Sequence, residues 1–582
     1  MEDSHKDPGP VSHSIKNSIY SFFSNEYTSF IIIAIFIGFF AGLANFAFVE
    51  VYSYIYKRVI LPFWGSPYVI IPVLSGGVLL VVLSFLFHDE VIGYGFPKFL
   101  EKINLRGGIL RPKETIAKAL GSCVTLGFGG SAGQEGPIAQ LGGAVGSFIG
   151  QIFKVSRGKI RVFVACGVAA GIAATFNAPV AGVLFAEEIA LLRDFKVGSF
   201  LPIVISSAVG TVVSHALRGN EPVFRVPPYE FVNIKELFFY ATFGLLLGVF
   251  ASGFIKLFLR AEERFSRLKR HSRLKPVLGG LVVGFMGIFF PYVLGNGYDH
   301  VEKALQDQLP LLVILGLILL KPLATSITLG SGWPGGIFAP AIFIGAVTGN
   351  AFGKLVDFIL SSPVSLSSAY ATVGMGTFLA AVTQAPLTSI FLIFEMTQNY
   401  KVVIPIMISS VLGSVVSRLI VGGSLESLEL SKAGINIEEE VEGRIIHLIQ
   451  AKDIMTRDVE TIPEGMTLRK LIEYIPQSHY TTFPLVDEKG NLTGIISIQD
   501  FRGWIFEESI KDLVVVKELA TLNVITVTPE DTLYKVFKKW EKKPVEILPV
   551  VESSSSKKIV GVLSRKDVIA AYNKALSKKT LD

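Results

Sequence analysis

Residues 129–137 read Gly-Gly-Ser-Ala-Gly-Gln-Glu-Gly-Pro, and Glu135 is the only charged residue between Ala119 and Phe153. A carboxylate in so apolar a stretch is costly inside a bilayer and indicates a function. The glycines allow a tight backbone turn, and proline suits the first turn of a helix. A helix that begins here would direct free N–H groups and its positive end at an anion. We therefore predict an anion site, with Glu135 beside it as a tethered anion.

The same pattern recurs about 200 residues later. Residues 123–150 and 326–353 agree at nine of 28 positions without a gap, among them Gly133 with Gly336 and Pro137 with Pro340. Further pairs follow in the same order: Ala178-Pro179 with Ala385-Pro386, Glu188 with Glu395, and Gly38 and Gly42 with Gly244 and Gly248. We predict two related halves, about 27–230 and 232–424. Repeats of this kind commonly surround a substrate site near the bilayer midplane.

The composition around these motifs is that of a membrane protein. Of 582 residues, 50% are apolar and 18% charged, and the mean hydropathy is +0.53. A membrane-spanning helix needs about 20 mostly apolar residues. Stretches of this kind without any charge are Tyr27–Val49, Val59–Phe87, Val197–Leu217, Leu237–Ile255 and Pro276–Tyr298. We predict a polytopic all-α membrane domain over residues 27–424.

The composition also excludes other classes of protein. It is too apolar for a disordered chain or an ordinary cytosolic enzyme, and two cysteines do not make a disulfide scaffold. The sequence contains no nucleophile–base pair and no metal-ligand set, and we predict no enzyme, no required cofactor and no nucleic-acid partner.

Basic residues predict the orientation. Residues 256–275 carry eight Lys or Arg against two Glu, which places this loop in the cytoplasm by the positive-inside rule. The N-terminal arm, residues 1–26, and the C-terminal tail are then expected to be cytoplasmic too. The short chain and lean loops favour a prokaryotic plasma membrane.

After residue 424 the chain changes character. Charges become frequent, and we predict a linker at 425–450 followed by a duplicated α/β unit at 451–510 and 515–575. In each copy a strand, a turn and a second strand lead to a helix that begins near Ser-x-x-Asp. The matching residues are Ser497 and Asp500 in the first copy, and Ser564 and Asp567 in the second.

Taken together, the membrane motifs resemble those of the CLC family of chloride channels and proton/chloride exchangers. The motifs are Gly93-Tyr-Gly-Phe-Pro97, Gly133-Gln-Glu-Gly-Pro137, Gly335-Gly-Ile-Phe-Ala-Pro340 and Glu395-Met-Thr-Gln-Asn-Tyr400. The resemblance implies two inverted repeats, a homodimer, one anion pathway in each subunit, and Glu135 as the gating glutamate. The anion-binding positions that it implies are Tyr94, Gly133, Gln134, Glu135, Gly136, Ile337, Phe338 and Tyr400.

Three departures from the family pattern matter. Tyr94 stands where the family usually has Ser or Pro, which leaves the preference among chloride, nitrate and fluoride open. Gln134 replaces the usual Arg or Lys. Ile189 occupies the proton-transfer position of exchangers, unless a one-residue slip in the alignment places Glu188 there.

Because an aliphatic side chain cannot relay a proton, the sequence favours a voltage- or pH-gated chloride conductance. A proton-coupled chloride antiporter is the alternative. A divalent-cation transporter with a regulatory tail is a further one, although cation pathways favour clustered carboxylates.

The tail resembles a pair of CBS domains. We therefore predict that the membrane domain is followed by a cytoplasmic α/β CBS pair. Some such pairs bind adenine nucleotides, with the Asp on the ribose and the Ser or Thr near the phosphates. The resemblance therefore implies ATP, ADP or AMP at Ser497, Asp500, Ser564 and Asp567. Helix capping alone also explains Ser-x-x-Asp.

Overall fold

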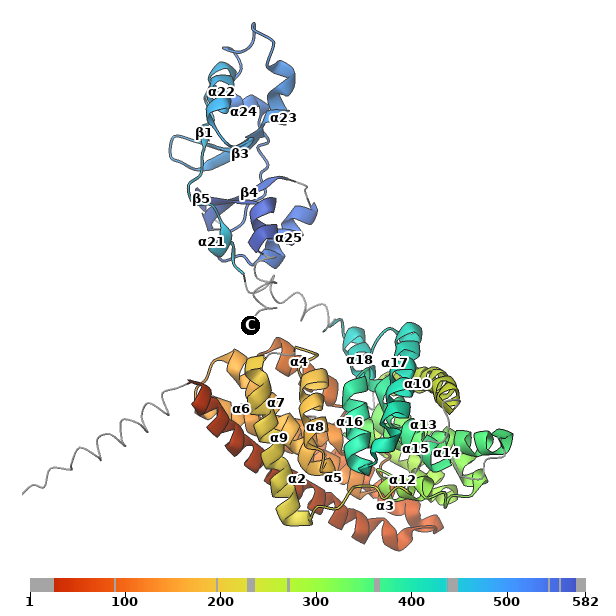
Figure 1. Cartoon of the computed structure of the whole chain (residues 1–582). Coiled ribbons are helices and arrows are strands. Elements are labelled where there is room, and N and C mark those ends of the chain that lie inside the picture. The colour runs from red at the N-terminus through yellow and green to blue at the C-terminus, as the bar shows by residue number, and fades with distance from the viewer. Residues whose placement is uncertain are drawn as a thin grey trace, which may run out of the picture. The chain divides into compact units, whose positions relative to one another are not determined.

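The computed structural model describes residues 26–87, 90–194, 197–227, 236–268, 273–360, 367–435, 437, 449–542, 545–553 and 556–571. The chain divides into two compact units, Met1–Glu438 and Glu439–Asp582. Each unit is described by itself (Figure 1). The predicted N-terminal arm lies outside the described residues except for Glu26.

The first half of unit 1 consists of helices and turns and contains no β-strand among the described residues. Its elements are α2 (Glu26–Val59), η1 (Leu61–Phe63), η2 (Pro67–Val69), α3 (Ile70–Leu86), α4 (Phe96–Leu105), α5 (Pro112–Gly127), α6 (Glu135–Ile152), α7 (Arg157–Phe176), α8 (Pro179–Phe185), the π-helix η3 (Ala186–Ala190) and α9 (Val197–Arg218).

The second half of unit 1 follows the same plan. Its elements are α10 (Glu236–Ser266), α11 (Lys275–Phe289), η5 (Pro291–Val293), α12 (Tyr298–Leu305), α13 (Leu311–Gly330), α14 (Phe338–Leu360), α15 (Ser367–Thr383), α16 (Pro386–Thr397), η6 (Tyr400–Val402), α17 (Val403–Val421) and α18 (Leu425–Lys432).

Unit 1 has the surface of a membrane protein. Eight helices of the described residues are long and apolar enough to cross a bilayer. Large apolar side chains point outward, such as Leu312 at 83% exposure and Phe358 at 84%. Water would penalise so much exposed apolar surface, whereas lipid does not.

Two of the uncharged stretches are not single helices. Val59–Phe87 contains the end of α2, two 3₁₀ turns and α3, and Pro276–Tyr298 contains α11 and a turn at Pro291. Pro62, Pro67 and Pro291 each begin or enter a new turn, because proline cannot donate a helical hydrogen bond.

Equivalent glycines pack equivalent helices in the two halves. Helix α2 lies along α9 (red and yellow in Figure 1), and α10 lies along α17. A Cβ at Gly38 would lie 2.5 Å from the Ser206 carbonyl oxygen, and one at Gly244 would lie 2.7 Å from that of Ser409. Contacts this close need glycine. The predicted architecture, an all-α membrane domain of two inverted repeats, is confirmed.

The predicted linker starts too early. Residues 425–432 form α18, which belongs to unit 1, with Leu425 and Leu430 buried. Ser424 begins this helix, because its Oγ accepts a hydrogen bond from the Ser427 N–H at 3.1 Å.

Unit 2 contains two small α/β cores. Helix α21 (Ala451–Ile454) comes first in the chain but packs in the second core. The first core comprises β1 (Ile462–Pro463), α22 (Leu468–Tyr474), η7 (Ile475–Gln477), β2 (Thr482–Val486), β3 (Leu492–Ser497), α23 (Ile498–Phe501), η8 (Arg502–Trp504) and α24 (Val516–Leu519). The second comprises α25 (Leu533–Lys542), β4 (Ile547–Ser553) and β5 (Ser556–Ser564), and residues 565–571 are helical.

The strands of unit 2 follow the predicted duplication. Strand β1 pairs parallel with β2, and β2–β3 and β4–β5 are antiparallel pairs. Each core is apolar: Phe483 and Ile496 are buried in the first, and Leu548 and Leu563 in the second. Helix α21 contributes Ala451 to the second core, so the two copies are interleaved at their N-terminal end.

Candidate functional site

Three helices of unit 1 begin at one point. Helix α4 starts at Phe96, α6 at Glu135 and α14 at Phe338. The rings of Phe96 and Phe338 meet edge to face, with centroids 6.2 Å apart. Helix N-termini leave N–H groups without partners and carry partial positive charge. Such a convergence of helix N-termini is the geometry that the sequence predicted for an anion site.

A pair of glycines holds the two halves together at this point. Gly133 and Gly336, which are repeat mates, exchange two backbone hydrogen bonds of 2.7 Å. A Cβ at Gly133 would lie 2.2 Å from Glu135 Oε2, so a larger residue would collide with that carboxylate. Glycine at this position therefore lets the Glu135 carboxylate stay where it is.

Glu135 is fully buried among hydrogen-bond donors. Its Oε2 accepts the Ala339 N–H at 3.2 Å, and its Oε1 accepts the Tyr298 hydroxyl at 2.5 Å. The carboxylate thus occupies the N-terminus of α14, where an anion would bind. Ala339, rather than Ile337 or Phe338, is the residue of this turn that donates to Glu135.

The other predicted residues of the two motifs lie close by. Gln134 Oε1 accepts a hydrogen bond from the Tyr52 hydroxyl. A Cβ on Gly136 would lie 3.4 Å from the Gly336 Cα. Ile337 and Phe338 are fully buried, and the ring of Phe338 packs 5.1 Å from that of Phe185.

Tyr400 does not join this group. It is 79% exposed, and its ring contacts Phe394 at 6.1 Å. Helix α16 ends at Gln398, whose left-handed φ of 50° redirects the chain. The structure therefore does not bring Tyr400 to the converging helix N-termini.

Tyr94, in the loop before α4, makes a second contact between a phenol and a carboxylate. Its hydroxyl donates to Glu426 Oε1 at 3.1 Å, and the exposed fractions of the two residues are 8% and 3%. Sequence reasoning missed Glu426, because it assigned residues 425–450 to a linker. The signal that could have found it is the Ser424 cap before the short pattern Leu-Glu-Ser-Leu-Glu-Leu.

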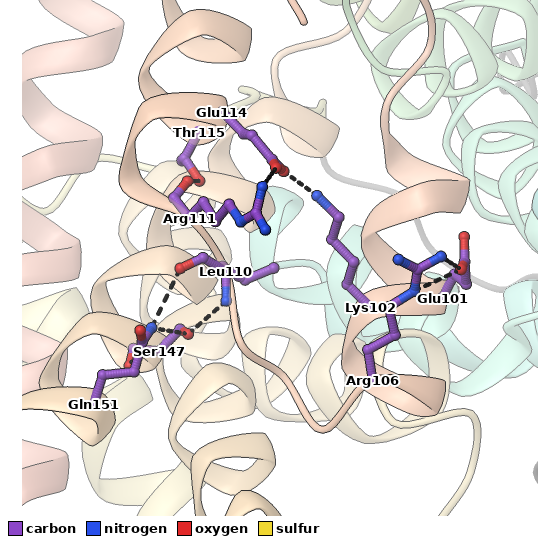
Figure 2. Close-up of polar contacts among 9 residues, drawn as sticks. All are labelled: Glu101, Lys102, Arg106, Leu110, Arg111, Glu114, Thr115, Ser147 and Gln151. Atoms are coloured by element: carbon purple, nitrogen blue, oxygen red, sulfur yellow. Dashed lines mark hydrogen bonds and ion pairs between the residues drawn. The ribbon is translucent and has the colours of Figure 1, made fainter. Parts of the chain in front are cut away.

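A basic cavity adjoins Tyr94. It has a volume of about 300 Å³, and its charged lining is Glu90, Lys98, Lys102, Arg111, Glu114 and Lys118. In Figure 2, Lys102 from α4 and Arg111 at the start of α5 both reach towards Glu114. Four basic groups outnumber two acidic ones, so the cavity attracts anions to the Tyr94 end of the site.

Two repeat-related lysines secure the loops around the site. Lys118 Nζ donates to the carbonyls of Ile92 and Gly93, both at 2.7 Å. Lys321, fully buried, donates to the carbonyls of Val293 and Gly295 at 2.9 Å. The first loop leads to α4 and the second to α12, which begins at Tyr298. A lysine side chain therefore holds the loop before α4, and its repeat mate holds the loop before α12.

Glu188 is engaged in capping a helix of the other half. Its carboxylate accepts the N–H groups of Leu387 at 3.3 Å and Thr388 at 2.7 Å, and so caps α16. Glu395 does the same for α8, through the N–H groups of Val180 at 3.0 Å and Ala181 at 2.7 Å. The internal repeat pairs these two acids. Each caps a helix of the other half, which explains why both halves carry a glutamate at this position.

Glu187, Glu188 and Ile189 all lie in the π-helix Ala186–Ala190 and are buried. Ile189 is 6% exposed, so the predicted position holds an aliphatic group. Glu187, which the sequence reasoning did not consider, is fully buried, and its carboxylate oxygens have no hydrogen-bond partner among the described residues. A π-bulge of this kind is frequent at functional sites.

In unit 2 the Ser-x-x-Asp residues line two cavities. Ser497 and Asp500 line one of about 520 Å³, and Ser564 and Asp567 line one of about 720 Å³. Each Asp bonds its Ser, with Ser497 Oγ 2.9 Å from Asp500 Oδ2 and Ser564 Oγ 2.6 Å from Asp567 Oδ2. Both cavities are in the size range of small-molecule sites.

Comparison with known proteins agrees with this geometry. The family described as "Voltage gated chloride channel" matches residues 76–418, and the CBS domain family matches residues 451–507 and 516–574. A protein of Ralstonia nicotianae named "Putative chloride channel protein ClcB-like" is 34% identical over 360 residues, 61% of this chain and 83% of that protein.

Two further relatives cover the membrane unit. The "H(+)/Cl(-) exchange transporter ClcA" of Vibrio parahaemolyticus is 30% identical over 435 residues, 71% of this chain and 92% of that protein. The crystal structure of a slow cyanobacterial Cl−/H+ antiporter superposes with a TM-score of 0.64 at 26% identity, covering 69% of this chain and 97% of that one. The chain is a multi-pass membrane protein of the voltage gated chloride channel family, with two C-terminal CBS domains.

Proposed function

We propose that this protein exchanges chloride for protons across the membrane, with Glu135 as the gate of the anion pathway. The observation that supports this most directly is the Glu135 carboxylate bound at the N-terminus of α14, 3.2 Å from the Ala339 N–H. An anion that competes for this N-terminus displaces the carboxylate. A proton on Glu135 neutralises it and releases it from the same site.

The second candidate is the uncoupled chloride conductance that the sequence favoured. Ile189 is the observation behind it, since an aliphatic group cannot carry a proton. Relatives named as exchange transporters, and a similar structure of a Cl−/H+ antiporter, favour the coupled alternative. The coupled mechanism then needs another proton-carrying group at the Tyr94 end.

Ion flux from liposomes with simultaneous pH recording tests both candidates. A chloride gradient should drive protons uphill at a fixed ratio. Glu135→Gln should abolish proton movement and leave chloride flux that no longer depends on pH. Glu263→Gln, an exposed acid on α10, is the control and should behave as wild type. Wild-type chloride flux without uphill proton movement would support the conductance instead.

The remaining features of the membrane unit are part of the same proposal. The subunit pairs with a second copy, and each copy has its own pathway. The basic loop at 256–275 supports a cytoplasmic position for this loop and the tail, in a bacterial plasma membrane. The proposed activity is transport, with no catalytic residue and chloride as cargo.

For the tail we propose an adenine nucleotide in the larger cavity. Arg565, Lys566 and His479 line it together with Ser564 and Asp567, and these groups suit phosphates and ribose hydroxyls. Glu546 lines both cavities, which disfavours phosphate at its end. The smaller cavity, with Ser497 and Asp500, is the second position.

Nucleotide binding can be measured on the full chain in detergent. ATP or AMP at 100 times its dissociation constant should stabilise the tail by about 2.7 kcal/mol. Asp567→Ala should abolish this stabilisation by nucleotide, and Asp500→Ala should reduce it by a smaller amount. Glu530→Ala, an exposed control, should leave it unchanged. No shift with either nucleotide at millimolar concentration would contradict the proposal.

A further inference from the structure

The hydrogen bond between Tyr94 and Glu426 closes the pathway at the end away from Tyr298. Both side chains are buried, and the phenol donates to Glu426 Oε1 at 3.1 Å. A phenol has one proton to donate. While this hydroxyl donates to Glu426, it cannot donate to an anion. The ionised Glu426 carboxylate also repels anions.

A second cavity connects this pair to the surface. Its volume is about 330 Å³, and it is lined by Tyr94, Glu262 and Glu429, with Arg273 and Lys275 at the basic loop. Arg273 and Ser266 are exposed, so the cavity opens to solvent. The basic cavity described above touches Tyr94 as well. Two routes, one rich in basic groups and one containing carboxylates, therefore meet at one phenol.

Glu429 stands between this cavity and Glu426. The two acids lie three residues apart on α18 and so share a helix face. Glu429 Oε2 is buried without a hydrogen-bond partner among the described residues. The charged groups packed around the pair are Glu262 and Lys432, 3.9 Å apart, then Arg273 and Lys275, and Lys118 behind Tyr94.

The arrangement repeats that of the other end. There the Tyr298 hydroxyl donates to Glu135, and here the Tyr94 hydroxyl donates to Glu426. Tyr298 follows Gly295-Asn-Gly297, and Tyr94 lies within Gly93-Tyr-Gly95, two loops held by the repeat-related Lys321 and Lys118. Each end of the pathway thus has one carboxylate and one phenol.

We propose that Glu426 is the second proton-carrying gate of the pathway. It takes over the role of the proton-transferring acid that exchangers have at the position of Ile189. A proton from the solvent-connected cavity binds Glu426, with Glu429 as the relay. The neutral acid then ceases to repel anions, and the Tyr94 hydroxyl turns to an anion arriving from the basic cavity. One proton is bound in this step, and no other bond forms or breaks. The inference rests on the proposed exchange.

The test measures chloride and proton movement in the same liposomes. Glu426→Gln keeps the size and an acceptor for Tyr94 but cannot ionise, and it should reduce the ratio of protons to chloride at least tenfold while chloride still moves. Glu263→Gln, the exposed control, should keep the wild-type ratio. Glu187→Gln should also keep it. Loss of coupling in Glu187→Gln with normal coupling in Glu426→Gln would overturn the proposal.

A second variant separates a proton carrier from a structural contact. Tyr94→Phe removes a donor from the ionised carboxylate, so the pH of half-maximal proton movement should shift upward. An unchanged pH profile would contradict the proposal even if Glu426→Gln failed to fold. Normal exchange by the wild type together with a normal ratio of protons to chloride in Glu426→Gln contradicts this inference alone. Wild type without exchange contradicts the proposed function and this inference together.

Discussion

The two halves of the membrane unit share a scaffold but not a chemistry. Gly142 packs α6 against α7 in the first half, and Gly345 packs α14 against α15 in the second, each with an imagined Cβ 2.2 Å from a carbonyl oxygen. At the N-termini of α6 and α14, however, Glu135 stands in one half and Phe338 in the other. The shared glycines hold helices together, whereas the two N-termini differ in the side chain that they present.

The largest effect is expected from the shared glycines. Gly142→Ala and Gly345→Ala should each destabilise the protein by about 3 kcal/mol, because a backbone oxygen cannot yield as a side chain can. Gly253→Ala, where an added Cβ would meet no atom within 4 Å, is the matched control and should be neutral or stabilising. Thermal unfolding in detergent measures all three. If Gly142→Ala lowered the unfolding temperature and Gly345→Ala did not, the two halves would not share the same packing requirement.

A smaller and equal effect is expected from the reciprocal caps. Glu188→Gln and Glu395→Gln weaken charge-assisted hydrogen bonds to the N-termini of α16 and α8, at a cost of about 1 kcal/mol each. Both variants should lower the unfolding temperature by a similar amount and leave the ratio of protons to chloride unchanged. A changed ratio in Glu188→Gln alone would give this acid a role that its mate lacks, and would sharpen the asymmetry.

The smallest effect concerns the tail, whose two copies also differ. Burial alone would raise the pKa of Asp531, but the Thr528 N–H, Lys535 and Lys539 outweigh it and lower that pKa. The stability from these contacts is therefore present above the unfolded pKa of about 3.9 and is lost as the pH falls through the folded value.

Asp531→Asn should cost the tail about 0.5 kcal/mol at pH 7 and less at a pH below the folded pKa of Asp531. Hydrogen exchange of the tail in the full chain measures this difference, with Glu530→Gln as the exposed neighbour control. An equal loss at both pH values would mean that packing, and not charge, is what Asp531 supplies.

The sequence predicted the helix starts at Glu135 and Phe338 because glycine and proline mark them locally. It predicted the repeat because equivalent glycines must recur wherever two helices touch. It missed the hydrogen bond from Tyr298 to Glu135, since 163 residues separate the partners and no pattern links them. Glu426 was missed for a related reason: a short charged helix reads as a linker until its buried face is known.

Tyr400 shows the opposite error. The motif was found at the expected place in the chain, but its tyrosine is exposed, so a motif's position did not decide where its side chain points. The π-helix at Ala186–Ala190 was also not predicted, because a change in helical winding leaves no mark on the spacing of apolar residues.

The paired glycines at the centre also limit how the protein can move. Rocking one half against the other would break both 2.7 Å bonds between Gly133 and Gly336 and leave four backbone groups without partners, at about 1–3 kcal/mol for each group. On the proposed mechanism, we therefore expect this pair of bonds to stay closed while the carboxylates and phenols around it rotate. Turnover then depends on the torsions of a few side chains, and distances between helix ends on the two faces should stay constant throughout the transport cycle.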